Sequence, residues 1–152
     1  MKLLFLAPLI FLCAFTYTGP ETEIIDIINQ ERAAHELAPL AKNWELARLA
    51  RYKTEEMLRL GYIGHYSPAY GTPRQMLDNF GVPASTVGVN AAKGQDNAGG
   101  VVRAWLTSPG HKKNLLDEGF TQAGVGFAYC QNGFPYWTII LIGIDMSHNI
   151  FH

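Results

Sequence analysis

The sequence predicts an α/β fold, an α-β-α sandwich with a small, mainly antiparallel sheet covered by helices on both faces. Several segments repeat apolar residues at helical spacing, so each of these helices has one apolar stripe to bury. Two apolar runs near the C-terminus flank Asn132-Gly133, a dipeptide typical of a tight hairpin between antiparallel strands. A sheet with helices on both faces buries every one of these stripes.

The first two helices are expected in the N-terminal third of the chain. Isoleucines recur among polar residues from Glu21 to Leu37, and acidic residues stand in the first turn, where they favour a helix. Pro39 then breaks the chain. Asn43 can cap a second helix, and Gly61 is a suitable residue to end it.

Three shorter segments complete the expected helices. A short third helix is expected from Thr72 to Phe80, because proline is tolerated in a first turn. Residues 81–95 are expected to form a loop, after which Asp96 can cap a fourth helix. Ser108-Pro109 predicts the start of a fifth, short helix with His111 in its first turn.

The strands are expected at Ala123–Cys130 and Phe134–Gly143. The run from Trp137 to Ile142 is almost continuously apolar, which is typical of a central strand covered on both faces. Cys130 belongs to an apolar run, so we interpret it as a buried small hydrophobic residue rather than a reactive thiol.

The N-terminus has the features of a secretory signal peptide. Lys2 precedes an apolar run that is shorter than the ~20 residues of a membrane-spanning helix. We therefore expect a signal peptide over residues 1–18, one domain over residues 22–145 and a C-terminal tail over residues 146–152. The expected location is secreted, extracellular or in the cell envelope.

Two alternatives remain for the N-terminal segment. The small residues that a cleavage site needs are poorly placed, so an uncleaved membrane anchor is one alternative and the expected route to any membrane contact. Lipidation of Cys13 is the other, although Phe11 and Leu12 stand where a lipoprotein signal has small residues.

Charge and cysteine content exclude some functions. The chain of 152 residues carries 12 Lys+Arg and 13 Asp+Glu, and the basic residues are scattered. Nucleic acid is therefore not an expected partner, because phosphate binding needs a concentrated basic face. Removal of the signal peptide would leave Cys130 as the only cysteine, which excludes an internal disulfide.

Two histidines stand in loop-like sequences rich in glycine and proline, Gly64-His65-Tyr66-Ser67-Pro68 and Ser108-Pro109-Gly110-His111. Such residues mark element boundaries, where binding residues concentrate on a rigid scaffold. We expect both imidazoles to face one cleft, although a single histidine is more often structural.

These motifs, in this order, resemble the CAP superfamily (the cysteine-rich secretory, antigen 5 and pathogenesis-related 1 proteins, also called the SCP domain), in its secreted bacterial branch. The similar residues run from about Ile24 to Gly143 and include Asn29-x-x-Arg32, Leu46-x-x-x-Ala50, Met57, the two histidine motifs, Gly88-Val89-Asn90, Trp105, Asn114, Gly124-Val125-Gly126 and Tyr136-Trp137-Thr138. The resemblance also implies the α-β-α sandwich. It further implies a cleft in which two histidines, here His65 and His111, meet acidic residues.

The acids of that cleft are missing at the matching positions. Val89 replaces the glutamate of the family's Gly-Glu-Asn turn, and Ser108 stands where a second acid is often found. Catalytic zinc generally needs three protein ligands, so we expect a degenerate site with no metal or cofactor beyond weak zinc binding. A glutamate at position 89 is expected to raise zinc affinity, at a stability cost that is modest in an open cleft and larger in a buried site.

Other acids offer a weaker substitute for the missing carboxylate. Asp96 has the sequence context of a helix cap, whereas Asp117 and Glu118 fit a solvated turn. We therefore predict a ligand-binding cleft without catalytic or metal-binding residues. Its expected members are His65, Asn90, Ser108 and His111.

Non-catalytic binding is the expected function, with a small ligand such as a lipid or cell-envelope component, or an extracellular protein, as the partner. Phe80, Val82 and Val87 could line an apolar groove for a lipid, or could pack in the core. One alternative is a metal-dependent hydrolase or peptidase that uses His65 and His111. Another is a structural component of an envelope or coat.

Overall fold

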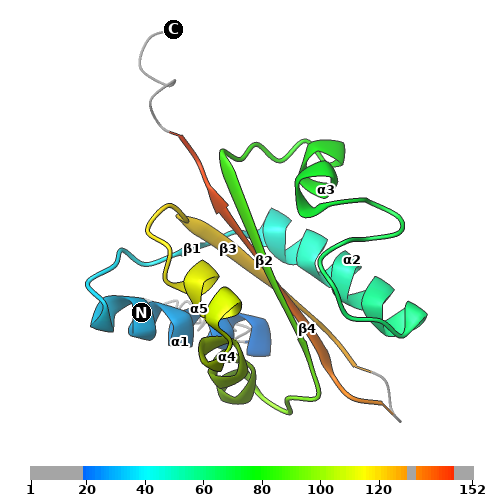
Figure 1. Ribbon diagram of the computed structural model, residues 1–152, viewed down its shortest axis with the longest axis horizontal. Helices are drawn as coiled ribbons and strands as arrows, with labels where there is room; N and C mark the ends of the chain where they lie inside the picture. Colours follow the sequence, from blue (N-terminus) through cyan, green and yellow to red (C-terminus); the bar gives the residue numbers. More distant parts are fainter. Residues whose placement is uncertain (1–18, 130–132, 146–152) are drawn as a thin grey trace, which may run out of the picture.

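The computed structural model describes residues 19–129 and 133–145 (Figure 1). Within these residues the strands form one sheet in the order β1-β3-β4-β2. The strands are β1 (Ala41–Lys42), β2 (Thr86–Lys93), β3 (Gln122–Ala128) and β4 (Tyr136–Gly143). The helices are α1 (Pro20–Ala34), α2 (Trp44–Leu60), α3 (Pro73–Asn79), α4 (Ala98–Thr107) and α5 (Pro109–Leu115).

The sheet lies between two helical layers, which confirms the predicted α-β-α sandwich. Figure 1 shows α1, α4 and α5 on one face of the sheet and α2 and α3 on the other. One apolar cluster, which includes Ile28, Trp105 and Trp137, fills the α1 and α4 side. Another, which includes Leu49 and Leu77, fills the α2 and α3 side.

Strand β4 is central, as its apolar run predicts. It pairs antiparallel with β3 on one side and with β2 on the other, and all of its residues are buried. β1 adds a short parallel pairing to β3, through Ala41 and Lys42. The predicted signal peptide, Cys13, Cys130, Asn132 and the C-terminal tail fall outside the described residues.

The prediction of a loop over residues 81–95 was wrong, because β2 occupies Thr86–Lys93 within it. Gly88 and Asn90 in the middle of this segment have low strand propensity, so local sequence gave little sign of a strand. Pairing with β4 along the whole segment, from Thr86 opposite Gly143 to Lys93 opposite Tyr136, overrides that propensity. The short β1 was also not predicted.

The predicted ends of α2 are confirmed, whereas two other helix boundaries differ. The Asn43 side chain accepts a hydrogen bond from the Leu46 N–H, and Gly61 ends α2 with φ 69°. α1 ends at Ala34, before the predicted Leu37.

The cap of α4 is Asn97, so the prediction of Asp96 was wrong. The Asn97 side chain accepts from the Gly100 N–H at 2.8 Å. Ser108 does stand at the N-cap of α5, but its side chain makes no capping hydrogen bond with the described residues. His111 is in the first turn of α5, as predicted.

Glycines allow α2 to lie directly on β3. A Cβ atom at Gly124 would lie 2.1 Å from the Ala47 nitrogen, and one at Gly126 would lie 2.2 Å from the Arg51 nitrogen. This close approach fixes the height of α2, and therefore of the loop that follows it, above the sheet. Among the described residues, no helix has the length and apolar character needed to cross a membrane.

Candidate functional site

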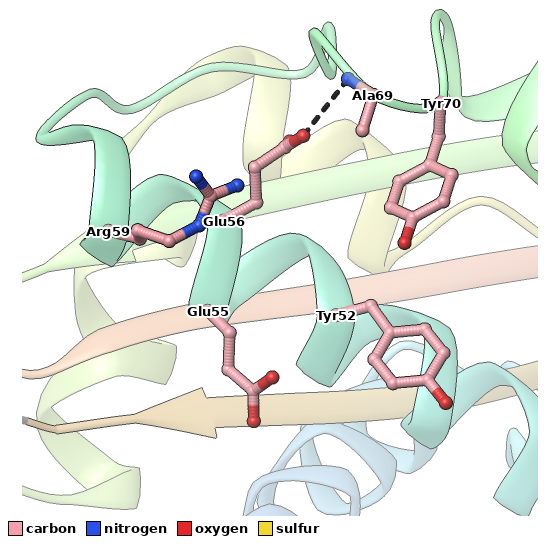
Figure 2. Close-up of a pocket in the computed structure, with 6 residues that line it drawn as sticks. All are labelled: Tyr52, Glu55, Glu56, Arg59, Ala69 and Tyr70. Carbon is pink, nitrogen blue, oxygen red and sulfur yellow. Dashed lines mark hydrogen bonds between the residues drawn. The ribbon is translucent and has the colours of Figure 1, made fainter.

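The loop between α2 and α3, residues 61–72, contributes to two clefts. Ile63, Gly64 and His65 of this loop line a cleft of about 230 Å³ together with Ala91 of β2 and His111 of α5. We call this the histidine cleft. Ala69 and Tyr70 line a second cleft, of about 270 Å³, together with side chains of α2 (Figure 2).

The two predicted histidines lie side by side in the histidine cleft. Their ring centroids are 6.3 Å apart and the rings are tilted by 55°. His65 is exposed and His111 is half-buried. The geometry therefore brings together two imidazoles from segments far apart in the sequence, while their role in binding stays a prediction.

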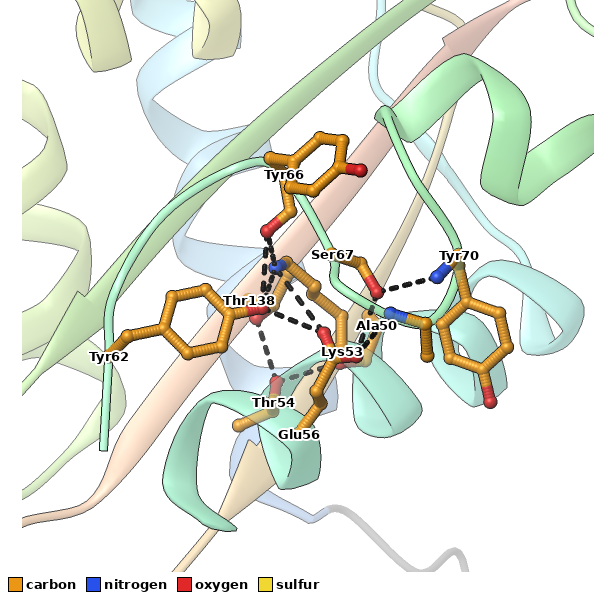
Figure 3. A network of polar contacts seen from close by, with 10 residues as sticks. Ala50, Lys53, Thr54, Glu56, Tyr62, Tyr66, Ser67, Tyr70 and Thr138 are labelled. Carbon is orange, nitrogen blue, oxygen red and sulfur yellow. Dashed lines mark hydrogen bonds and ion pairs between the residues drawn. The ribbon is translucent and has the colours of Figure 1, made fainter. Parts of the chain in front are cut away.

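A buried polar network holds the loop that carries His65 (Figure 3). The Lys53 ammonium donates to the Tyr62 hydroxyl oxygen at 2.6 Å and to the Tyr66 carbonyl at 2.7 Å. The Glu56 carboxylate accepts from the Tyr62 hydroxyl at 2.7 Å, from the Ser67 hydroxyl at 2.9 Å and from the Ala69 N–H at 3.1 Å. One helical turn of α2 thus fixes both sides of His65.

Burial and hydrogen bonding set the charges of this network. Lys53 is 3% exposed and Glu56 is 4% exposed. Burial lowers the pKa of Lys53, although the Glu56 carboxylate opposes that change. Burial alone would raise the pKa of Glu56, but the hydrogen bonds from Tyr62, Ser67 and the Ala69 N–H, with the Lys53 charge, outweigh it and lower that pKa. The pKa of Tyr62 is raised by burial and by the adjacent carboxylate.

Sequence reasoning missed this network. It assigned Lys53 and Glu56 to no site, although they occupy the inward-facing stripe of α2 with Ala50 and Met57. A charged residue on an apolar stripe signals a buried partner, because an unpaired buried charge is costly. The Ser67 side chain serves the turn that follows it, since its hydroxyl accepts from the Tyr70 N–H at 2.9 Å.

His111 is positioned by contacts of its backbone and of its helix. The Asn90 side chain donates to the His111 carbonyl at 3.1 Å and accepts from the Asn114 side chain at 2.9 Å. The buried Arg32 guanidinium donates to the Leu115 carbonyl at 2.8 Å and so anchors the end of α5 to α1. These contacts attach α5 to both β2 and α1.

Two of the four predicted cleft residues lie in supporting positions. Asn90 is fully buried below the His111 backbone. Ser108 stands at the start of α5, where its carbonyl accepts from the Lys112 N–H at 2.8 Å. His65 and His111 line the cleft itself.

Two physical effects favour the neutral imidazole at His111. Burial lowers its pKa, and the nearby His65 ring lowers it further. A neutral imidazole offers one hydrogen-bond donor and one acceptor. The described residues contain no group of three or more His, Cys, Asp or Glu side chains placed to hold a metal ion.

The position of the missing glutamate, the residues of the possible lipid groove and one of the substitute acids do not line the histidine cleft. Val89 is 6% exposed in the apolar cluster beneath α2 and α3. Phe80, Val82 and Val87 pack against the same cluster, in agreement with core packing. The Asp117 carboxylate accepts from the Gly119 N–H at 2.8 Å, in agreement with a turn.

Comparisons with known proteins agree with this fold. The model of the cysteine-rich secretory protein family, CAP, matches residues 25–141. The uncharacterized protein YkwD of Bacillus subtilis is 41% identical over 123 residues, which are 81% of this chain and 47% of that protein.

Solved structures are similar over the same region. An extracellular protein containing an SCP domain from Bacillus anthracis has a TM-score of 0.76 at 33% identity, covering 83% of this chain and 41% of that chain. An outer surface protein from Borrelia burgdorferi shares the fold, with a TM-score of 0.75 at 20% identity over 81% of this chain and 91% of that chain. This chain spans about half the length of YkwD and 36% of the length of a second Bacillus subtilis relative, the uncharacterized membrane protein YlbC. With the family match covering most of its residues, the chain belongs to the cysteine-rich secretory protein (CAP) family.

Proposed function

We propose that this chain is a non-catalytic binding domain, secreted or held in the cell envelope, that binds a small ligand in the histidine cleft. The observation that carries the proposal is the pairing of the His65 and His111 rings at 6.3 Å beside a cleft. Two features support the location: the signal-like N-terminal residues 1–18, and the similarity to an extracellular protein of Bacillus anthracis.

The lining of the histidine cleft indicates the ligand chemistry. Ile63, Gly64 and Ala91 supply apolar surface, while the two imidazoles supply hydrogen-bonding groups at the same place. A ligand with a small apolar body and one acidic or hydroxyl group matches both parts. Such chemistry occurs in lipids and in other cell-envelope components, which we propose as the ligand class. An extracellular protein that inserts a similar group is the other proposed partner.

A metal-dependent hydrolase is the second candidate. It is favoured by the closeness of the imidazoles, since two histidines are part of many zinc sites. It is disfavoured because the described part of the chain supplies no third side chain for the metal. A general base would also be needed to activate water, and two imidazoles without an orienting carboxylate are poorly suited to that task.

Calorimetric titration with sodium octanoate and with zinc separates these candidates. Octanoate should bind the unmodified protein, and binding should be lost in the double variant His65→Ala/His111→Ala. The matched control is His35→Ala, which removes an exposed histidine at the end of α1 that hydrogen-bonds its own helix. Zinc should bind weakly.

Two results would overturn the proposal. Octanoate binding that survives the double variant would place the ligand elsewhere. Tight zinc binding that depends on both histidines would instead support the hydrolase.

A further inference from the structure

The second cleft is lined by α2 and by the 61–72 loop. It has a volume of about 270 Å³ and is lined by Tyr52, Glu55, Glu56, Arg59, Ala69 and Tyr70. Figure 2 shows the two tyrosine rings on one side of this cleft and the three charged side chains on the other. Drug-sized ligands commonly occupy ~300–1,000 Å³, so this cleft fits a smaller molecule or one unit of a chain.

The tyrosines form a firm aromatic wall. Phe80 supports both rings, with centroid distances of 5.9 Å to Tyr52 and 5.4 Å to Tyr70. Tyr52 is 37% exposed, so part of its ring is accessible to a ligand. The tyrosine hydroxyls have no hydrogen-bond partner among residues 19–129 and 133–145, which leaves them available as donors and acceptors.

The charged wall is electrically balanced. Glu55 and Arg59 lie one turn apart on α2, and neither has an ion-pair or hydrogen-bond partner in the described structure. Glu56 adds no free negative charge, since its oxygens already accept from Tyr62, Ser67 and Ala69 and the Lys53 ammonium lies 3.7 Å away. One accessible carboxylate and one accessible guanidinium remain.

This combination matches a neutral, polyhydroxylated ligand better than an ion. A cation would be attracted by Glu55 but repelled by Arg59, and an anion the reverse, so the balanced pair offers an ion little net attraction. A sugar ring has an apolar C–H face that can stack on tyrosine. Its adjacent hydroxyls can donate to a carboxylate and accept from a guanidinium, whose donors form a planar fork.

We infer that the second cleft binds one pyranose unit of a glycan, with the ring on Tyr52 and Tyr70 and its hydroxyls on Glu55 and Arg59. This site is separate from the histidine cleft and does not depend on the function proposed for it. The two clefts share only the loop of residues 61–72 as a common wall.

Titration with tri-N-acetylchitotriose, followed by amide chemical shifts in NMR spectra, tests the inference. The Ala69 and Tyr70 amides should shift and saturate at millimolar sugar. Tyr52→Ala should weaken binding about tenfold, Arg59→Ala should weaken it several-fold, and Tyr52→Phe should retain most of it. Trp44→Ala is the matched control, because it removes another exposed aromatic residue of α2 and should leave binding unchanged.

The results also separate this site from the histidine cleft. The double variant His65→Ala/His111→Ala should bind the sugar as the unmodified protein does. The inference is overturned by an absence of saturable shifts, by equal binding to Tyr52→Ala, or by shifts confined to the histidine cleft. Choline chloride that binds this cleft as well as the sugar does would also overturn it.

Discussion

A few buried polar residues hold the two histidines of the histidine cleft in place. His65 depends on a buried lysine and a buried glutamate that do not line the histidine cleft, and His111 depends on Asn90 through its backbone. The imidazoles could be identified from their glycine- and proline-rich surroundings. The residues that hold the His65 loop in place could not be identified in this way, because Lys53 and Glu56 contact a loop whose path the sequence does not specify. Asn90 was predicted for the cleft, yet its amide is consumed by the His111 carbonyl and Asn114.

Replacement of Glu56 by Gln should destabilise the protein and loosen the loop. The substitution keeps the shape but leaves the Lys53 ammonium buried without a countercharge, and a broken buried pair costs on the order of 3 kcal/mol. Urea unfolding should report that loss, and the Ala69 and Tyr70 amides should exchange faster with solvent. Glu55→Gln on the exposed side of α2 should change the free energy of unfolding by less than about 0.5 kcal/mol. Equal effects of the two substitutions would show that the buried pair does not support the loop.

The lowered pKa of His111 predicts a pH dependence of stability. The unfolded imidazole takes up a proton as the pH falls below about 6.5, whereas the folded one resists it because of burial and the His65 ring. Unfolded chains therefore bind more protons in this window, and stability should fall as the pH decreases through it.

Urea unfolding of the unmodified protein and of His111→Gln, at about pH 7 and about pH 5, checks this sign. The variant should lose less stability on acidification, and the control His35→Gln should lose as much as the unmodified protein does. A steeper loss in His111→Gln would contradict the assigned direction.

At the scale of elements, the apolar runs and the caps of α2 were predicted correctly, whereas strand β2 and the cap of α4 were not. The apolar run of β4 predicted a central strand, and Asn43 and Gly61 predicted the ends of α2. β2 was missed because its position depends on pairing with β4, a contact between segments that are far apart in the sequence. The correct cap of α4 was missed because Asp96 and Asn97 are adjacent and equally suitable as cap residues.

Because Val89 lies on β2 with its side chain buried, we expect a charged residue at this position to destabilise the fold. Its side chain belongs to the same buried apolar cluster as Leu49 and Ile140, so Val89→Glu should reduce stability by several kcal/mol. Thermal or urea unfolding measures the loss. Thr86→Glu at the exposed start of the same strand is the control and should cost much less. A small cost for Val89→Glu would mean that this side chain reaches the open cleft.

At the scale of the whole molecule, the fold brings the 61–72 loop, which carries His65, and α5, which carries His111, to the same edge of the sheet. β2 is the last strand in the sheet order, and its residue Ala91 lines the histidine cleft together with residues of the 61–72 loop and of α5. The α-β-α class followed from helical stripes that need two faces of a sheet. The expectation that His65 and His111 face one cleft came from their glycine- and proline-rich motifs, and the family resemblance implied the same cleft. No local pattern specifies which segments adjoin across an edge strand.

An NMR titration of the histidine ring protons with sodium octanoate tests directly whether the histidine cleft binds a small ligand. The His65 and His111 resonances should shift together and saturate at the same octanoate concentration, while those of His35 stay in place, because His65 and His111 line the histidine cleft and His35 does not. Ring protons of His65 and His111 that do not respond, or that respond no more than those of His35, would contradict it.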